Sequence, residues 1–181
     1  MSGDLTHFLL PTSRLPTDVT FLLPTSTFPA HKGILSTNLT AFDDLFFGPF
    51  ADRGRKVVEV DGISADSFHL FLRHCYGDKV EVEGIGELPI LAELHALAGR
   101  YGDSDLLREV GGRVRGLVAE ETDPGELAEL QGLLVGLEVG ELAKVVGARL
   151  EEVAPEVTEE NFARLVGVAE GAAQQVSSFD S

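Results

Sequence analysis

The period of the hydrophobic pattern changes along the chain, and this change limits the folds that the chain can adopt. Short apolar runs rich in β-branched and aromatic residues occupy 18–23, 28–31 and 57–61, and they predict strands. From residue 88 onward the apolar residues recur at steps of three and four, which is the spacing of amphipathic helices. Strands followed by a cluster of helices indicate an α+β fold rather than a regular alternation of strands and helices.

The first half of this pattern predicts a hairpin and then two helices. A turn that begins with proline joins the first two predicted strands. One amphipathic helix is expected from Lys32 up to the Gly48-Pro49 pair, which ends it. Ser64 is expected to cap the next helix. The apolar face of that helix carries Phe68, Phe71, Leu72 and Cys75. The alternation at 79–83 predicts an edge strand.

Four amphipathic stripes then continue toward the carboxyl terminus. They consist of Leu88, Leu91, Leu94, Leu97, Ala98 and Tyr101; of Leu106, Leu107, Val110, Val114 and Leu117; of Leu127, Leu130, Leu134 and Leu137; and of Leu142, Val145, Val146, Leu150 and Val153. Ser104 is the expected cap of the second helix. A last short helix is expected from Thr158, and the polar residues 171–181 are expected to be a disordered tail.

The charge of the chain is large and unevenly distributed. Fourteen basic and 30 acidic residues give a net charge of −16, of which −5 lies in residues 1–116 and −11 in residues 117–181. Turn residues at 120–125 mark the same place, so we expect a boundary there. The net charge argues against nucleic acid as a partner, because no basic face could dominate the surface.

Several other kinds of protein are excluded by composition. No apolar run is long enough to span a bilayer and no signal peptide is expected, so a membrane is not predicted as a partner. The single cysteine, Cys75, favours an intracellular location in the cytoplasm, the nucleus or both. His69, His74 and His95 lack the close spacing of metal ligands, and no glycine-rich phosphate loop occurs. No metal and no cofactor is therefore expected.

Spaced motifs of the first two thirds of the chain together resemble the BTB/POZ domain. The motifs are Asp18-Val-Thr-Phe21, Phe28-x-Ala30-His31-Lys32-x-Ile34-Leu35, Phe42-x-x-Leu45-Phe46, Val58-x-Val60-x-Gly62-Ile63-x-x-x-x-Phe68 and Leu72-x-x-x-Tyr76-Gly77. The stripe from Leu91 to Tyr101, with Leu106, resembles the closing helical hairpin of that family. Leu39 departs from the small serine usual in the family, which should alter local packing and not the fold.

The resemblance implies a domain organisation and a general role. A BTB/POZ domain, a small mixed sheet flanked by helices, is expected at 5–118. The acidic helices at 119–170 resemble a shortened BACK extension, followed by the tail at 171–181. Such domains are interaction modules that self-associate, so the resemblance implies a homodimer or a mixed BTB oligomer.

His31 allows a catalytic and a structural interpretation. A histidine oriented by Asp18 could activate a serine such as Ser36, as in a hydrolase. No glycine-rich elbow or second motif completes such a site. We favour a buried histidine that joins a strand to a helix by hydrogen bonds, and the family resemblance implies the same structural role.

Asp18 and Lys32 are candidates for a dimer interface. In transcription-factor members of the family, an aspartate and a basic residue at the matching positions form a charged pocket near that interface. The alternative is a pair of solvated charges, which would contribute little. If the pocket is buried, loss of Asp18 leaves Lys32 unpaired, so Asp18→Asn is expected to weaken self-association.

Phe50 and Asp52 are candidates for a cullin contact. They follow the helix expected from Lys32 to Gly48, where cullin-binding members of the family carry a motif of a hydrophobic residue, any residue and a glutamate. An exposed apolar anchor there would fill a pocket of the cullin, although aspartate is one methylene shorter than glutamate. The alternative is a phenylalanine that closes the core under a loop.

The sequence therefore predicts a protein–protein interaction and oligomerisation module, not an enzyme. Its expected role is that of an adaptor for a cullin-type ubiquitin ligase. The alternative is a homo-oligomeric scaffold that binds no cullin and serves transcription or a channel. The acidic runs Glu120-Glu121 and Glu151-Glu152 are either solvated faces or a surface that attracts a basic protein partner.

Overall fold

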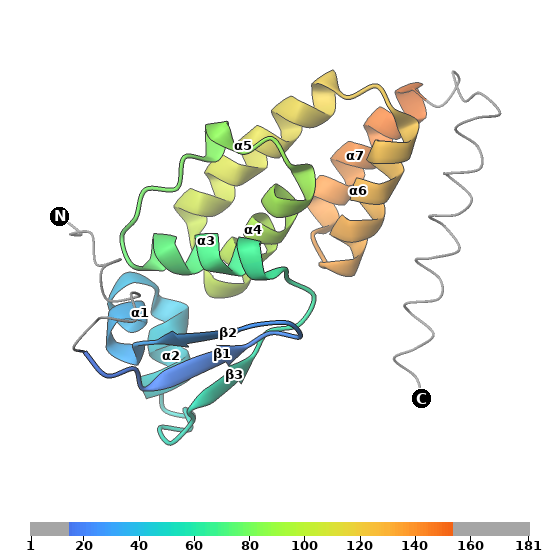
Figure 1. Ribbon diagram of the computed structural model, residues 1–181. Coiled ribbons are helices and arrows are strands. Elements are labelled where there is room, and N and C mark those ends of the chain that lie inside the picture. Colours follow the sequence, from blue (N-terminus) through green and yellow to red (C-terminus); the bar gives the residue numbers. More distant parts are fainter. Residues whose placement is uncertain (1–14, 154–181) are drawn as a thin grey trace, which may run out of the picture.

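The computed structural model describes residues 15–153, and it confirms the predicted α+β organisation (Figure 1). The strands in this part are β1 (Val19–Leu22), β2 (Thr27–Ala30) and β3 (Val57–Glu59). The helices are α1 (Lys32–Asn38), α2 (Thr40–Phe47), α3 (Ala65–Cys75), α4 (Leu88–Tyr101), α5 (Ser104–Glu120), α6 (Pro124–Gly136) and α7 (Gly140–Val153), with a short 3-10 turn at Val82–Gly84. The helix expected from Thr158 and the tail expected at 171–181 lie outside the described residues.

The sheet has the strand order β2-β1-β3 and is mixed. β1 and β2 form the predicted antiparallel hairpin, in which Phe21 lies opposite Phe28. β3 pairs in parallel with β1, so that Phe21 also lies beside Val58. Along β1 and just after it, Val19, Phe21 and Leu23 are buried while the residues between them are not, because alternate side chains point to the face that the helices cover.

The expectation of one continuous helix between Lys32 and Gly48 is wrong, since α1 and α2 are separated at Leu39. The backbone of Leu39 is extended, with φ −132° and ψ 123°. The side-chain amide of Asn38 donates to the carbonyl oxygen of Cys75 at 2.7 Å, which fastens the end of α1 to the end of α3. The apolar residues keep a spacing of three and four across the break, so periodicity alone did not reveal it.

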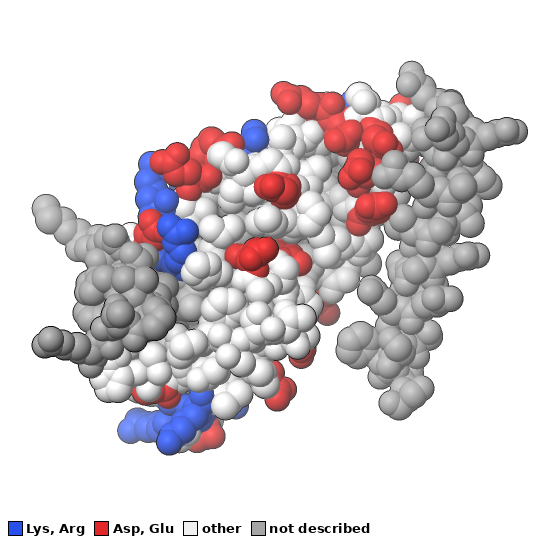
Figure 2. All heavy atoms as spheres, viewed as in Figure 1, with Lys and Arg blue, Asp and Glu red and all other residues white. Residues whose placement is uncertain are grey.

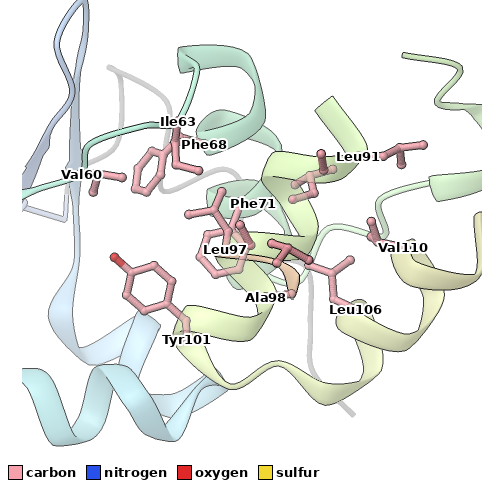
Figure 3. Close-up of a cluster of buried hydrophobic side chains, with 14 of the residues drawn as sticks. Val60, Ile63, Phe68, Phe71, Leu91, Leu97, Ala98, Tyr101, Leu106 and Val110 are labelled. Atoms are coloured by element: carbon pink, nitrogen blue, oxygen red, sulfur yellow. The ribbon is translucent and has the colours of Figure 1, made fainter. Parts of the chain in front are cut away.

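An aromatic core joins the sheet to α2, α3 and α4. The Phe42 and Tyr101 rings stack with centroids 4.4 Å apart, and Phe71 stacks on Tyr101 at 5.4 Å. Phe21 of β1 meets Phe42 edge-on at 5.9 Å. Figure 3 shows Phe71 and Tyr101 together with other buried apolar side chains from α3, α4 and α5. Aromatic pairs of this kind contribute about 0.5–1.5 kcal/mol each beyond the burial of their area.

The edge strand predicted at 79–83 is wrong. The segment is irregular and then enters the 3-10 turn at Val82–Gly84, with hydrogen bonds between neighbouring residues instead of a ladder. Val82 is fully buried and the flanking glutamates are exposed, so the alternation of burial persists without a strand. Arg113 of α5 donates to the carbonyl oxygen of Ile85 at 3.3 Å, and this contact holds the segment against the helix.

One predicted helix cap is confirmed and another is wrong. The Ser64 hydroxyl accepts a hydrogen bond from the Ser67 N–H at the start of α3, as expected. At the start of α5 the cap is Asp103 rather than Ser104. The Asp103 carboxylate accepts from the Leu106 N–H at 2.9 Å, and a carboxylate also suits the positive end of a helix.

The last two described helices form a pair against α4 and α5 (Figure 1). Asp123 caps α6 by accepting from the Gly125 N–H at 2.7 Å, and Pro124 occupies the first helical position. Arg149 of α7 donates to the Glu121 carbonyl oxygen at 3.0 Å and so joins the end of α7 to the connection after α5. Between residues 15 and 153, no helix combines the length and apolar character needed to cross a bilayer.

Candidate functional site

His31 lies at the junction between β2 and α1, and its side chain is only 4% exposed. The Tyr76 hydroxyl accepts from the His31 backbone N–H at 2.9 Å and lies 2.8 Å from the ring Nδ1. The ring Nε2 is 3.1 Å from the carbonyl oxygen of Leu15. A carbonyl oxygen can only accept, so Nε2 carries the proton and Nδ1 accepts from Tyr76.

This arrangement ties the ring in place instead of leaving it open for proton transfer. Both ring nitrogens are occupied, and burial raises the pKa of Tyr76 well above its usual value, with hydrogen bonding by the His31 backbone opposing the rise. The hydroxyl therefore stays protonated and acts as a fixed connector between α1 and the end of α3. Burial and these contacts fit a structural role for His31.

Asp18 and Lys32 do come together, but through the backbone of the lysine. The exposed Asp18 carboxylate accepts from the Lys32 N–H at 2.8 Å. Lys32 is the first residue of α1, which has no side-chain cap of its own at His31. Asp18, which directly precedes β1, therefore supplies the acceptor that the start of this short helix needs.

Lys32 is 6% exposed, and the contacts of its side chain are with residues other than Asp18. Its Nζ donates to the Arg53 carbonyl oxygen at 3.3 Å and lies 5.4 Å from the centre of the Phe46 ring. Both contacts are to neutral groups, so within the described residues the ammonium keeps a charge that no carboxylate offsets. The expectation of two solvated charges is wrong for Lys32 because the side chain is buried.

Phe50 projects completely from the loop that joins α2 to β3, with 100% of its side chain exposed. The alternative in which this phenylalanine closes the core is therefore wrong. Asp52 is also exposed, and its Oδ1 accepts from the Gly54 N–H at 2.9 Å, which shapes the turn after Phe50. The two candidate residues thus lie on one exposed loop, next to the half-exposed Phe47 at the end of α2.

A basic stretch in the same loop was missed by the sequence interpretation. Arg53, Arg55 and Lys56 are all exposed, and within residues 15–153 none of them is in an ion pair. Figure 2 shows blue side chains gathered at the lower end of the molecule, where this loop lies. The signal was present in the sequence, because three cations within four residues are unusual in a chain with twice as many acids as bases.

The other candidate ligand residues do not come together. The His69 ring stacks on Phe28, while His74 Nε2 lies 2.7 Å from the Asp103 carboxylate. Burial, followed by the charge of Asp103, raises the pKa of the Cys75 thiol, which keeps it protonated and unreactive. Among residues 15–153, no three His, Cys, Asp or Glu side chains are grouped so that they could hold a metal ion.

Comparisons with known proteins support the family resemblance. A model of the BTB/POZ domain matches residues 10–109, more than half of the chain. Kelch-like protein 24 from human and from rat is 33% identical over 70 residues, which is 39% of this chain and 12% of each relative. Kelch-like protein 24a from zebrafish is 36% identical over 64 residues, 35% of this chain and 11% of the relative.

A similar solved structure is the BTB domain of zebrafish PATZ1. It is 23% identical, covers 65% of this chain and 86% of its own, and superposes with a TM-score of 0.45. The matched segment spans about an eighth of the length of the Kelch-like relatives.

Proposed function

The chain belongs to the BTB/POZ domain family of protein–protein interaction modules, and from that premise we propose that it is an adaptor for a cullin-type ubiquitin ligase. The proposal assigns Phe50 as the apolar anchor for the cullin and Asp52 as the acidic residue beside it. It also assigns self-association to the region around Asp18 and Lys32, where a charged pocket is found in transcription-factor members of the family.

The exposure of Phe50 supports the cullin contact most directly. Phe50 is fully exposed, so its ring contributes no hydrophobic burial to the isolated protein and would gain it at an interface. Aromatic side chains are typical anchors at the centre of interfaces. Phe50 follows α2, the place at which cullin-binding members of the family carry their hydrophobic–x–Glu motif. Asp52 shapes the loop with one carboxylate oxygen, and the other oxygen is left for a partner.

The buried ammonium of Lys32 supports self-association. A cation that is removed from water and contacts only neutral groups is stabilised when a carboxylate approaches it. A second copy of the chain, or another BTB protein, could supply that carboxylate at an interface. A homo-oligomeric scaffold without a cullin remains the second candidate function, and the same observation favours it.

One experiment separates the two candidates. The full chain, Phe50→Ala and Val135→Ala are each used to capture the amino-terminal region of a cullin scaffold. Val135 is a matched control, because it is a large exposed apolar residue on α6, far from the loop. The adaptor proposal expects capture by the unmodified chain and by Val135→Ala, and at least a tenfold loss for Phe50→Ala, about 1.4 kcal/mol.

The mass by light scattering is measured on the same samples without the cullin fragment. Self-association with no cullin capture would favour the scaffold and remove the adaptor. Equal capture by all three proteins would remove Phe50 from the contact.

A further inference from the structure

We propose that the Phe50 loop of one copy docks into a cleft of a second copy, forming a head-to-tail contact that competes with the cullin. The Phe50 loop is defined by Phe50, Arg53, Arg55 and Lys56. The α4–α7 cleft is defined by Ala96, Leu107, Leu137, Glu138, Val139 and Glu141. The inference rests on the proposed function in one respect, since it describes how access to Phe50 is regulated.

The Phe50 loop has the composition of a docking element. Its aromatic ring is fully exposed, and the three cations that follow have no ion-pair partner within residues 15–153. A partner for this loop therefore needs an apolar hollow with carboxylates at its edge.

The α4–α7 cleft offers that combination. Its floor is apolar, with Ala96 and Val139 buried and Leu107 and Leu137 partly buried. Glu138 and Glu141 line it and are exposed. The Glu141 carboxylate lies 3.0 Å from the Lys144 ammonium, but both groups are well exposed, so this pair contributes little and can exchange for an arginine of a partner.

Two basic residues, His95 and Arg100, also line the cleft, but the cleft still favours a basic partner. Burial, followed by the charge of Arg115, lowers the pKa of His95, so this ring is neutral at physiological pH. Arg100 is exposed at the other edge and can turn toward water. The two glutamates thus outnumber the single permanent cation among the lining residues.

The loop and the cleft cannot meet within one molecule. The loop precedes β3, whereas Leu137 of the cleft lies against Gly62, which follows β3. Figure 1 shows the loop at the lower end of the sheet and the α6–α7 turn beside α4, with β3 between them. In Figure 2, basic side chains gather at the lower end and along the left edge of the molecule, and acidic side chains lie over α6 and α7.

A contact between two different surfaces of the same chain leaves one loop and one cleft free at the ends of each assembly. It can therefore continue beyond two copies, into rings or open chains, whereas a symmetric contact closes at a dimer. Because Phe50 is buried at each such contact, assembly hides the residue assigned to the cullin.

The test uses the full chain and measures mass against concentration by sedimentation velocity, at low and at high salt. We expect species larger than a dimer that grow with concentration and are lost at high salt. The loop variant Arg53→Glu/Arg55→Glu/Lys56→Glu and the cleft variant Glu138→Lys/Glu141→Lys should each lower the association constant beyond the dimer at least tenfold. Circular dichroism verifies that each variant is folded.

The decisive arm mixes these two variants. The reversed loop is acidic and the reversed cleft is basic, so the mixture should regain assembly that neither variant shows alone. Glu83→Lys/Glu87→Lys is the matched control, since it makes the same change of charge at exposed glutamates outside both surfaces and should assemble like the unmodified chain.

Three results would each overturn the inference. The unmodified chain could stay a single species at all concentrations, the mixed variants could fail to assemble, or the control variant could lose as much of its association constant as the loop and cleft variants. A chain that captures the cullin fragment but does not assemble removes this inference and leaves the proposed function. Because assembly hides Phe50, capture of the cullin fragment is measured at low concentration, below the range in which the larger species form. A chain that assembles at high concentration but captures no cullin fragment at low concentration removes the proposed function alone. If the chain both captures the cullin fragment and assembles, added cullin fragment should dissociate the larger species.

Discussion

The sheet with α1 to α5 and the pair α6–α7 bury apolar side chains by different means. The first region is built on aromatic rings, with Phe21, Phe42, Phe71 and Tyr101 in mutual contact across four elements. The described part of α6 and α7 contains no aromatic residue and buries aliphatic side chains, including Leu127, Leu130, Leu134, Leu142 and Val146.

This difference indicates which region fixes geometry and which one adapts. Stacked rings have preferred orientations and large buried areas, so they hold the sheet and helices in one arrangement. The pair, with the turn that joins its helices, carries five glycines and a net charge of −4, and it packs against α4 and α5. We therefore expect the aromatic region to limit global stability and the pair to open first.

The largest expected effect comes from breaking the aromatic region at its centre. Phe42→Ala removes the ring that contacts both Phe21 and Tyr101, and it should lower the free energy of unfolding by about 3–5 kcal/mol. Urea denaturation followed by circular dichroism measures this. Phe50→Ala is the matched control and should change stability by no more than about 0.5 kcal/mol. Similar losses for both variants would contradict the assignment of the core.

A cavity in the helical pair should act locally. Leu134→Ala removes a fully buried side chain from α6 and should cost about 2–5 kcal/mol. Hydrogen exchange should show faster exchange of amides in α6 and α7, while those of β1 and α3 keep their protection. Uniform acceleration along the chain would show instead that the two regions unfold as one unit.

The Tyr76 hydroxyl, which connects the start of α1 to the end of α3 through His31, should give a smaller change in the free energy of unfolding. Tyr76→Phe keeps the ring but leaves the His31 N–H and Nδ1 without their buried partner. Such unsatisfied groups cost about 1–3 kcal/mol, which urea denaturation can measure. His31→Phe in the same background removes the orphaned ring nitrogen, so the double variant should lose less than the sum of the single losses. Additive losses would argue against the connection.

Sequence patterns predicted much of the first region because its signals are local. The hairpin, the cap at Ser64 and the apolar faces of α3 and α4 follow from residue type and spacing alone. The break at Leu39 and the missing strand at 79–83 depend on contacts far along the chain, namely Asn38 with the end of α3 and Arg113 with the segment before α4. Periodicity carries no information about such contacts.

The candidate residues could be chosen from sequence, but their surroundings could not. The family resemblance implied that Asp18 and Lys32 lie together, yet the contact is made by the lysine backbone and not by its ammonium. The exposure of Phe50 depends on the path of its loop, which a motif does not encode. The positions assigned to the dimer interface and to the cullin contact stay predictions until association is measured.

The contact of Asp18 allows a prediction that separates its backbone role from a charge role. Asp18→Ala removes the acceptor for the first N–H of α1 and should cost about 1 kcal/mol in urea denaturation. Asp18→Asn keeps an oxygen at the same place and should retain most of that stability. If Asp18→Asn also keeps the unmodified dimer constant in sedimentation, the charge of Asp18 has no part in self-association.

The smallest expected effect would make the helical pair more stable and so reduce its difference from the aromatic region. Glu138 follows α6 with φ 60°, a left-handed backbone in which a side chain is disfavoured and glycine is usual. The Val139 N–H bonds to the Leu134 carbonyl oxygen at 2.8 Å, so the conformation belongs to the helix end and will persist after substitution. Glu138→Gly should therefore raise the free energy of unfolding of the pair by about 1 kcal/mol.

Glu138→Ala separates this backbone effect from the loss of a carboxylate. It removes the charge but keeps the Cβ, and it should give no comparable gain. Both variants are compared by hydrogen exchange of the α6 and α7 amides at high salt, where assembly through the α4–α7 cleft is suppressed. An equal gain for both would mean that acidic repulsion, rather than the left-handed residue, weakens the pair, and the lower stability expected of this region would then have to be attributed to its charge.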